Sequence, residues 1–156
     1  MTFSGRHNAK EYRKRHVMLV DNDKGAADVV TWILSQNHFP VKRFSEPGKA
    51  LKEFRKNQER YQVIIVDARM PGMTGFEFAR RIRKISTEVR IVLLTDFQIT
   101  KSEFGKVFPS SQIDDIVVKP TAPEKLIQAV TGVDVPKFSD DSVGNGRRQD
   151  YQSAVF

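Results

Sequence analysis

Three short runs of this chain are continuously apolar: VMLV at residues 17–20, VIIV at 63–66 and IVLL at 91–94. A strand is apolar without interruption when both faces of its sheet are covered, which is typical of parallel sheets with helices on each side. Two further β-rich runs, Val41–Phe44 and Ile116–Val118, bring the number of expected strands to five. The sequence therefore predicts a five-stranded parallel sheet between layers of helices.

In the segments between these runs, apolar residues recur at the spacing of one face of a helix. The expected core stripes are Ala26, Val29, Val30, Ile33 and Leu34; Ala50, Leu51 and Phe54; Phe78, Ala79, Ile82 and Ile85; and Leu126, Ile127 and Val130. Outside the third stripe lie Arg80, Arg81, Arg83 and Lys84. Residues 99–108 form the weakest helical segment, because Gly105 interrupts sparse apolar residues. This alternation of strand and helix predicts a doubly wound α/β fold.

The length of 156 residues fits one compact domain with two tails. We expect a flexible basic arm over residues 1–15, a folded domain over 16–133, and a disordered tail over 134–156, where apolar residues are few. The chain has no cysteine, which excludes disulfides and thiolate metal sites. No apolar run approaches the roughly 20 residues of a membrane helix. A cytoplasmic protein without membrane contact is therefore expected.

The net charge of +7 is concentrated in part at the N-terminus. Residues 1–15 contain five lysines and arginines against the single acid Glu11. Such an arm can bind nucleic acid or another acidic surface. A short basic run at a terminus is more often only solvated, so nucleic-acid binding by the arm is the less favoured interpretation.

Polar residues follow four of the five expected strands. Asp21 and Asn22 come after the first run, Asp67 after the third, Thr95 after the fourth and Lys119 after the fifth. Ligands of parallel α/β sheets bind outside the carboxyl ends of the strands. Carboxylates there suit Mg²⁺, while a lysine and a hydroxyl can offset the charge of a transferring phosphoryl group. Each residue alone can be explained as a cap or surface residue, but such residues at four strand ends together favour a phosphate site.

The segments VDND, VDARMPGMTG, LLTD and VVKP together resemble the receiver domain of two-component response regulators, over about residues 16–133. The most specific parts are D-x-x-M-P-x-x-x-G, from Asp67 to Gly75, and the Lys119-Pro120 pair. The resemblance implies a flavodoxin-like fold with strand order 2-1-3-4-5 and a cis bond before Pro120. The short C-terminal tail further suggests a stand-alone, chemotaxis-regulator-like receiver, because it cannot build an output domain.

The resemblance also implies roles for individual residues. Asp67 would accept a phosphoryl group from a sensor histidine kinase or phosphotransfer protein, and the phosphoprotein would then bind a downstream protein target. Mg²⁺ would be held by Asp21, Asn22, Asp67 and the backbone carbonyl of Arg69. Thr95 and Lys119 would stabilise the phosphoryl group. Such a domain is not an enzyme, apart from self-phosphorylation and autodephosphorylation.

Three residues depart from the family pattern. Asn22 stands where a second acid is usual, and Asp96 stands where a small residue usually follows the threonine. Ile116 occupies the position of the aromatic residue that, with Thr95, forms the family's switch. We expect Asp96 to pair with Arg69 as a gate at the mouth of the site. The departures leave open an alternative, a degenerate receiver that is not phosphorylated and acts as an interaction module.

A second family also begins with two acids after a buried strand. In haloacid-dehalogenase-like phosphatases a D-x-D motif, here Asp21 and Asp23, supplies a nucleophile and an acid. That fold needs a further acidic pair late in the chain, where only Asp140-Asp141 is available. It would also leave Asp67 without a role, so the receiver is the favoured interpretation.

Overall fold

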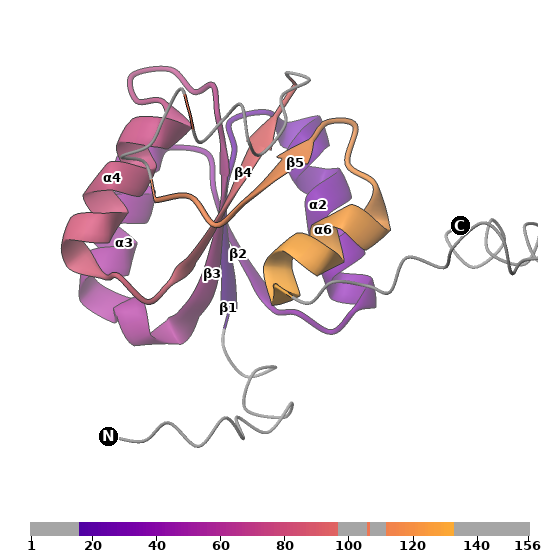
Figure 1. Ribbon diagram of the computed structural model, residues 1–156, viewed down its shortest axis with the longest axis horizontal. Helices are drawn as coiled ribbons and strands as arrows, with labels where there is room; N and C mark the ends of the chain where they lie inside the picture. Colours follow the sequence, from indigo (N-terminus) through magenta and orange to yellow (C-terminus); the bar gives the residue numbers. More distant parts are fainter. Residues whose placement is uncertain (1–15, 97–105, 107–111, 133–156) are drawn as a thin grey trace, which may run out of the picture.

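A computed structural model describes residues 16–96, 106 and 112–132 of the chain, and a parallel sheet runs through its centre (Figure 1). The strands are β1 (His16–Val20), β2 (Val41–Phe44), β3 (Tyr61–Asp67), β4 (Arg90–Thr95) and β5 (Asp115–Val118). Their order across the sheet is β2-β1-β3-β4-β5, and every neighbouring pair is parallel. The predicted flavodoxin-like fold and its strand order are confirmed.

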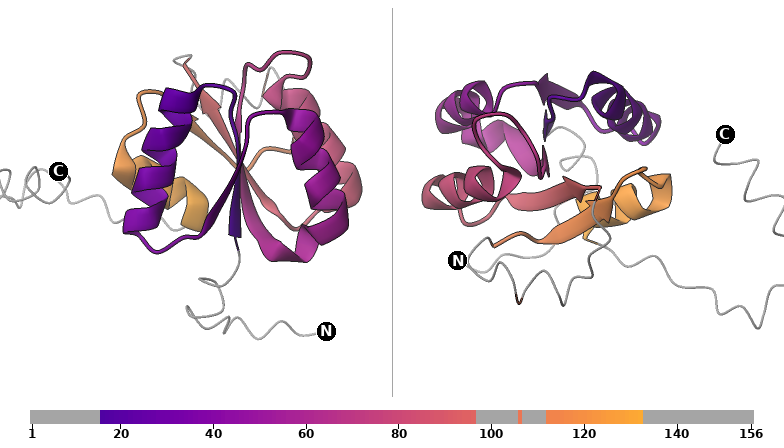
Figure 2. Two further views of the ribbon diagram at one scale, coloured as in Figure 1. Left: turned by 180° about the vertical axis from the view of Figure 1, so that it is seen from behind. Right: turned by 90° about the horizontal axis from the view of Figure 1, so that it is seen from above.

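Helices cover both faces of this sheet (Figures 1 and 2). The helical elements are α2 (Lys24–Gln36), α3 (Pro47–Asn57), the short 3₁₀ helix η1 (Gln58–Arg60), α4 (Gly75–Ile85) and α6 (Pro123–Thr131). Helices α3 and α4 lie side by side on one face, and α2 and α6 lie on the other. The weak helix predicted within residues 99–108 falls mostly outside the described residues.

The sheet separates two apolar cores, which explains why its inner strands are apolar throughout. Alternate side chains of β1 point to opposite faces, so Met18 and Val20 join the core under α3 and α4. Val17 and Leu19 join the core under α2 and α6. All four side chains are fully buried.

The core-facing stripe of α2 differs from the prediction at two positions. Ala27 is buried on this helix, whereas Ala26 is only partly buried and Val29 is 49% exposed. The buried residues of α2 define its core face, and at a period of 3.6 residues per turn Val29 falls outside that face. Packing buries Val30, and Val29 therefore lies at the surface together with Trp32.

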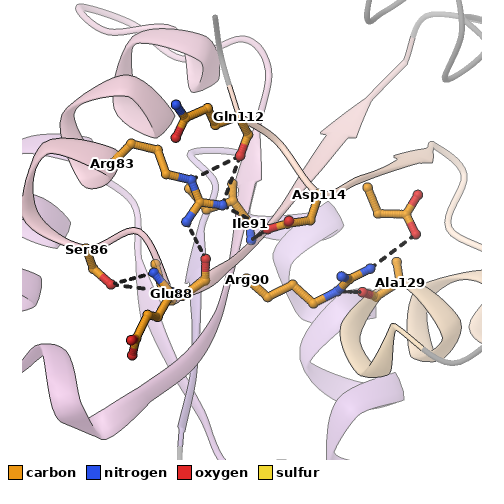
Figure 3. A network of polar contacts seen from close by, with 10 residues as sticks. Arg83, Ser86, Glu88, Arg90, Ile91, Gln112, Asp114 and Ala129 are labelled. Atoms are coloured by element: carbon orange, nitrogen blue, oxygen red, sulfur yellow. Dashed lines mark hydrogen bonds and ion pairs between the residues drawn. The ribbon is translucent and has the colours of Figure 1, made fainter. Parts of the chain in front are cut away.

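Arg83 was expected on the outer surface of α4, but its side chain is only 9% exposed. Its guanidinium donates hydrogen bonds to the carbonyl oxygens of Val89 and Gln112 and pairs with Asp114 at 2.8 Å (Figure 3). The same Asp114 carboxylate accepts a hydrogen bond from the backbone N–H of Ile91. Arg83 thus ties α4 to the start of β4 and to the segment that enters β5.

Replacing Arg83 by methionine is expected to lower the free energy of unfolding by about 2–3 kcal/mol, because several charge-assisted hydrogen bonds are lost together. Urea denaturation followed by circular dichroism measures this change. The matched control is Arg80→Met on the exposed side of the same helix, which should change stability by less than about 0.5 kcal/mol. Equal effects of the two substitutions would contradict a structural role for the Arg83 contacts.

Candidate functional site

Four polar residues meet at the carboxyl end of the sheet. Asp21 directly follows β1, Asp67 and Thr95 end β3 and β4, and Lys119 directly follows β5. The strand register brings them together: the backbone N–H of Lys119 donates to the carbonyl oxygen of Thr95 at 2.7 Å. Asp21, Asp67 and Thr95 are all buried. The strand-end rule used on the sequence therefore located one common site.

The ammonium group of Lys119 lies between two carboxylates. Its Nζ is 2.9 Å from Asp67 Oδ1 and 3.3 Å from Asp21 Oδ2. The Asp21 side chain is fully buried, and the Asp67 side chain keeps 10% of its surface exposed. The Lys119-Pro120 bond is cis, as predicted. Asp67 is thus the carboxylate of this pair that a second molecule can reach.

The ionisation of these groups follows from their surroundings. Burial raises the pKa of Asp67, and the nearby Asp21 carboxylate acts in the same direction. Hydrogen bonds from Lys119 and from the Arg69 backbone N–H oppose this rise without cancelling it. For Lys119, burial would lower the pKa, but the two carboxylates outweigh it and the pKa is raised. One lysine therefore balances two acids, and the cluster can accept further positive charge.

The acids of the opening VDND segment have separate roles. The Asp23 side chain accepts a hydrogen bond from the Ala26 backbone N–H and caps the N-terminus of α2. The backbone N–H of Asp23 donates to Asp21 Oδ1 at 2.9 Å, which helps to fix the buried carboxylate. Asn22 lies between them and is exposed. Only Asp21 of this segment therefore reaches Lys119.

The loop after β3 is held by backbone contacts that sequence reasoning did not find. The N–H of Ala68 donates to the carbonyl oxygen of Leu94, and the N–H of Gly75 donates to that of Ala68. A Cβ atom at Gly75 would collide with the carbonyl oxygen of Asp67 and lie 2.9 Å from Leu93 Cδ1. Glycine therefore lets α4 begin directly against the end of β3. Of these contacts only the glycine leaves a signal in the sequence.

Three further residues were predicted to belong to the site: Arg69, Asp96 and Ile116. Arg69 and Asp96 are exposed, and the ion pairs among the described residues do not include one between them. The gate formed by these two residues stays a prediction. Ile116 is partly buried against the core under α3 and α4, and it pairs with Leu93 in the sheet. A role for Ile116 in a switch likewise stays a prediction.

The carboxylates at this edge can supply part of a magnesium site, whose other oxygens would come from outside this cluster. Across residues 16–96, 106 and 112–132, no group of three or more His, Cys, Asp or Glu residues is placed to hold a metal. The site instead offers the two carboxylates of Asp21 and Asp67. Mg²⁺ is commonly bound by one or two carboxylates, with water and substrate phosphates supplying the other oxygens. The carboxylate pair is therefore compatible with Mg²⁺ bound together with a phosphoryl group.

Residues 17–131 match the family model described as the response regulator receiver domain. The chain belongs to this family of two-component response regulators, as the sequence motifs predicted. Because the family match covers the sheet and the site, the haloacid-dehalogenase-like alternative is wrong. The capping role of Asp23 agrees with this conclusion, since it leaves no D-x-D pair facing one site.

Several curated relatives share this domain. The transcriptional regulatory protein CreB of Escherichia coli (strain K12) is 29% identical over 134 residues, which are 83% of this chain and 56% of that protein. The probable transcriptional regulator ycf27 of Guillardia theta is 32% identical over 125 residues, 77% of this chain and 45% of that protein. This chain therefore spans about half the length of the curated relatives it matches.

Solved structures agree with the receiver fold. A high-resolution structure of the Vibrio cholerae chemotaxis protein CheY4 has a TM-score of 0.63 and 30% sequence identity, covering 76% of this chain and 98% of that one. A putative response regulator from Chloroflexus aurantiacus has a TM-score of 0.66 at 24% identity, covering 76% and 97%. The second similarity supports the fold alone. In the part of the chain that the structure describes, no helix is long and apolar enough to cross a membrane.

Proposed function

We propose that this protein is a phosphorylatable receiver, in which Asp67 accepts a phosphoryl group and the modified domain signals by binding a downstream protein. The observation that carries this proposal is the Lys119 ammonium held between the carboxylates of Asp67 and Asp21. Membership of the response regulator family supports a histidine kinase or a phosphotransfer protein as the donor. We assign the receiver to residues 16–133, with the arm 1–15 and the tail 134–156 outside it, and we place its action in the cytosol.

The transfer step needs one nucleophile and compensation for negative charge. A carboxylate oxygen of Asp67 attacks the phosphorus, the bond to the donor breaks, and the donor leaves with the electron pair, which gives an acyl phosphate on Asp67. Lys119 already contacts Asp67 and can follow the new phosphoryl oxygens without a large movement. The hydroxyl of Thr95, at the end of the neighbouring strand, can donate a hydrogen bond to the same group. The domain itself turns over no substrate beyond its own phosphorylation and dephosphorylation.

A magnesium ion at this site would be held by Asp21, Asp67, the Asn22 side chain and the backbone carbonyl of Arg69. When bound, the ion neutralises the negative charge that gathers between the carboxylates and the phosphoryl group. Asn22 contributes a neutral amide oxygen where a second carboxylate would be a stronger ligand. We therefore expect this site to bind Mg²⁺ more weakly than a site with two adjacent acids.

Incubation with acetyl phosphate and Mg²⁺, followed by intact mass measurement, tests the proposal. We expect one added phosphoryl group per chain, and none when EDTA removes the metal. Complete absence of uptake in Mg²⁺ would instead support the second candidate, a degenerate receiver that acts only by binding partners. The observations that favour this second candidate are Asn22 in place of an acid and the additional exposed charge of Asp96.

The proposed gate gives a prediction of its own. Replacing Asp96 by alanine is expected to speed phosphorylation about threefold, because a surface carboxylate that repels an anionic donor is removed. Arg69→Ala should slow the reaction by leaving Asp96 without a nearby cation. Single-turnover rates with acetyl phosphate measure both effects. Glu59→Ala, an exposed acid at the amino end of the sheet, is the control and should not change the rate. Equal rates in all four proteins would exclude the gate.

A further inference from the structure

Charge is distributed unequally between the two helical layers. Helices α3 and α4 each contain four basic residues and one acid. Helices α2 and α6 each contain one basic residue and one acid. Since α3 and α4 lie side by side on the same face of the sheet (Figures 1 and 2), the positive charge of the helices gathers there.

Most of these cations are available to a partner. Six of them are exposed, and no ion pair within the described residues uses any of them. We call this group the basic face; its members are Lys52, Arg55, Lys56, Arg80, Arg81 and Lys84. The other two basic residues of this layer are already occupied, Lys49 by Glu46 and Arg83 by Asp114.

The spacing along the helices places these cations outward. Lys52 and Lys56 are four residues apart on α3, on the side opposite the buried Leu51 and Phe54. Arg80 and Lys84 repeat this spacing on α4, on the side opposite its own buried residues. Two rows of cations therefore run along adjacent helices. In each row the two residues are separated by about 6 Å along the helix axis, at a rise of 1.5 Å per residue.

Helix stability explains only part of this arrangement. Arg55, Lys56 and Lys84 lie in the last turns of their helices, where a cation interacts favourably with the helix dipole. Lys52, Arg80 and Arg81 lie before the last turns and gain little from that effect. They also have no acidic partner within the described residues, so they add charge to the surface without a stabilising contact of their own.

The chemistry of the face favours a phosphate backbone over an apolar partner. In the described part of the chain, the exposed large apolar side chains are Val29 and Trp32, both on α2 in the opposite layer. A membrane or a hydrophobic protein surface would need such side chains among the cations.

We propose that the basic face on α3 and α4 binds the phosphate backbone of nucleic acid, independently of base sequence. A chain with pI ≈ 9.8 and cations clustered on one face has the electrostatic pattern of such proteins. The interaction uses a layer that contains neither Asp67 nor Lys119. It therefore does not depend on the phosphoacceptor role and can be tested without phosphorylation.

The experiment compares two double variants of the whole chain that lose the same charge. Lys52→Gln/Lys84→Gln removes one lysine from each helix of the basic face. Lys24→Gln/Lys125→Gln removes one exposed lysine from each helix of the opposite layer. Binding of a labelled 20-base-pair DNA duplex of arbitrary sequence is followed by fluorescence anisotropy at several salt concentrations. Circular dichroism confirms that both variants are folded.

The basic-face variant should lose roughly tenfold or more in affinity at low salt. The plot of the logarithm of the association constant against the logarithm of the salt concentration has a negative slope, and its magnitude should decrease by about two. The control variant should retain the slope of the wild type. Equal losses in both variants, or no binding by the wild type, would overturn the proposal. Poly-glutamate and unlabelled duplex are then compared as competitors at equal concentrations of negative charge. If poly-glutamate displaced the labelled duplex equally well, the proposal would also be overturned, and an acidic protein would be indicated as the partner.

Discussion

Replacing Lys119 by methionine is expected to slow phosphorylation of Asp67 by about a hundredfold to a thousandfold. Losses of this size are usual when one preorganised group that stabilises a transition state is removed. Methionine preserves the length of the side chain but removes the charge that contacts Asp67 at 2.9 Å and Asp21 at 3.3 Å. The pKa of Asp67, already raised by burial and by Asp21, should rise further without this partner. Fewer molecules would then carry the reactive carboxylate, and the attached phosphoryl group would lack a cation.

Rates of phosphoryl incorporation from acetyl phosphate, at equal Mg²⁺ and with folding checked by circular dichroism, measure this effect. Lys125→Met is the matched control, because it makes the same substitution at an exposed site on α6. The control should react at the rate of the wild type. A Lys119→Met protein that also reacted at the wild-type rate would show that the lysine contacts are structural only.

The second large effect is expected at Gly75. Substitution by alanine should lower the free energy of unfolding by about 3 kcal/mol, near the upper end for overpacked sites. The added methyl group would collide with the backbone carbonyl of Asp67, which cannot move aside as a flexible side chain could. The same displacement should disturb the phosphoacceptor loop and slow phosphorylation.

Gly48→Ala supplies the comparison, because the residue is helical and, apart from its chain neighbours and the backbone of its own helix, no atom lies within 4 Å of the position of its Cβ. This control should be more stable than the wild type by about 0.5–1 kcal/mol, since alanine restricts the unfolded chain. Urea denaturation of both variants gives the two changes on one scale. A Gly75→Ala protein as stable as the Gly48→Ala protein would contradict the close approach of α4 to β3.

The sheet could be predicted from the sequence because its signals are local. Runs such as Val63–Val66 are apolar on both faces, and the strands found in the structure extend them by two residues or fewer at either end. The location of the site could also be predicted from the sequence, because the carboxyl ends of parallel strands lie at one edge of the sheet. Thus the positions of Asp21, Asp67, Thr95 and Lys119 could be anticipated without knowledge of the loops.

Contacts between elements could not be predicted in the same way. Arg83 has the same spacing as other exterior cations of α4, yet only the position of β5 shows that it reaches Gln112 and Asp114. Val29 fits a helical stripe as well as Val30 does, and only packing against the sheet decides which is buried. The basic face was hidden for the same reason, because α3 and α4 are separated in sequence by β3 and its loop.

The central claim is that Asp67 accepts the phosphoryl group, and intact mass measurement of two asparagine variants tests it most directly. Asp67→Asn removes the proposed nucleophile, whereas Asp23→Asn makes the same change at an exposed capping residue, where asparagine is an equally good N-cap. After incubation with acetyl phosphate and Mg²⁺, wild type and Asp23→Asn should each gain one phosphoryl group, and Asp67→Asn should gain none. A phosphoryl group that persisted in Asp67→Asn would contradict the assignment.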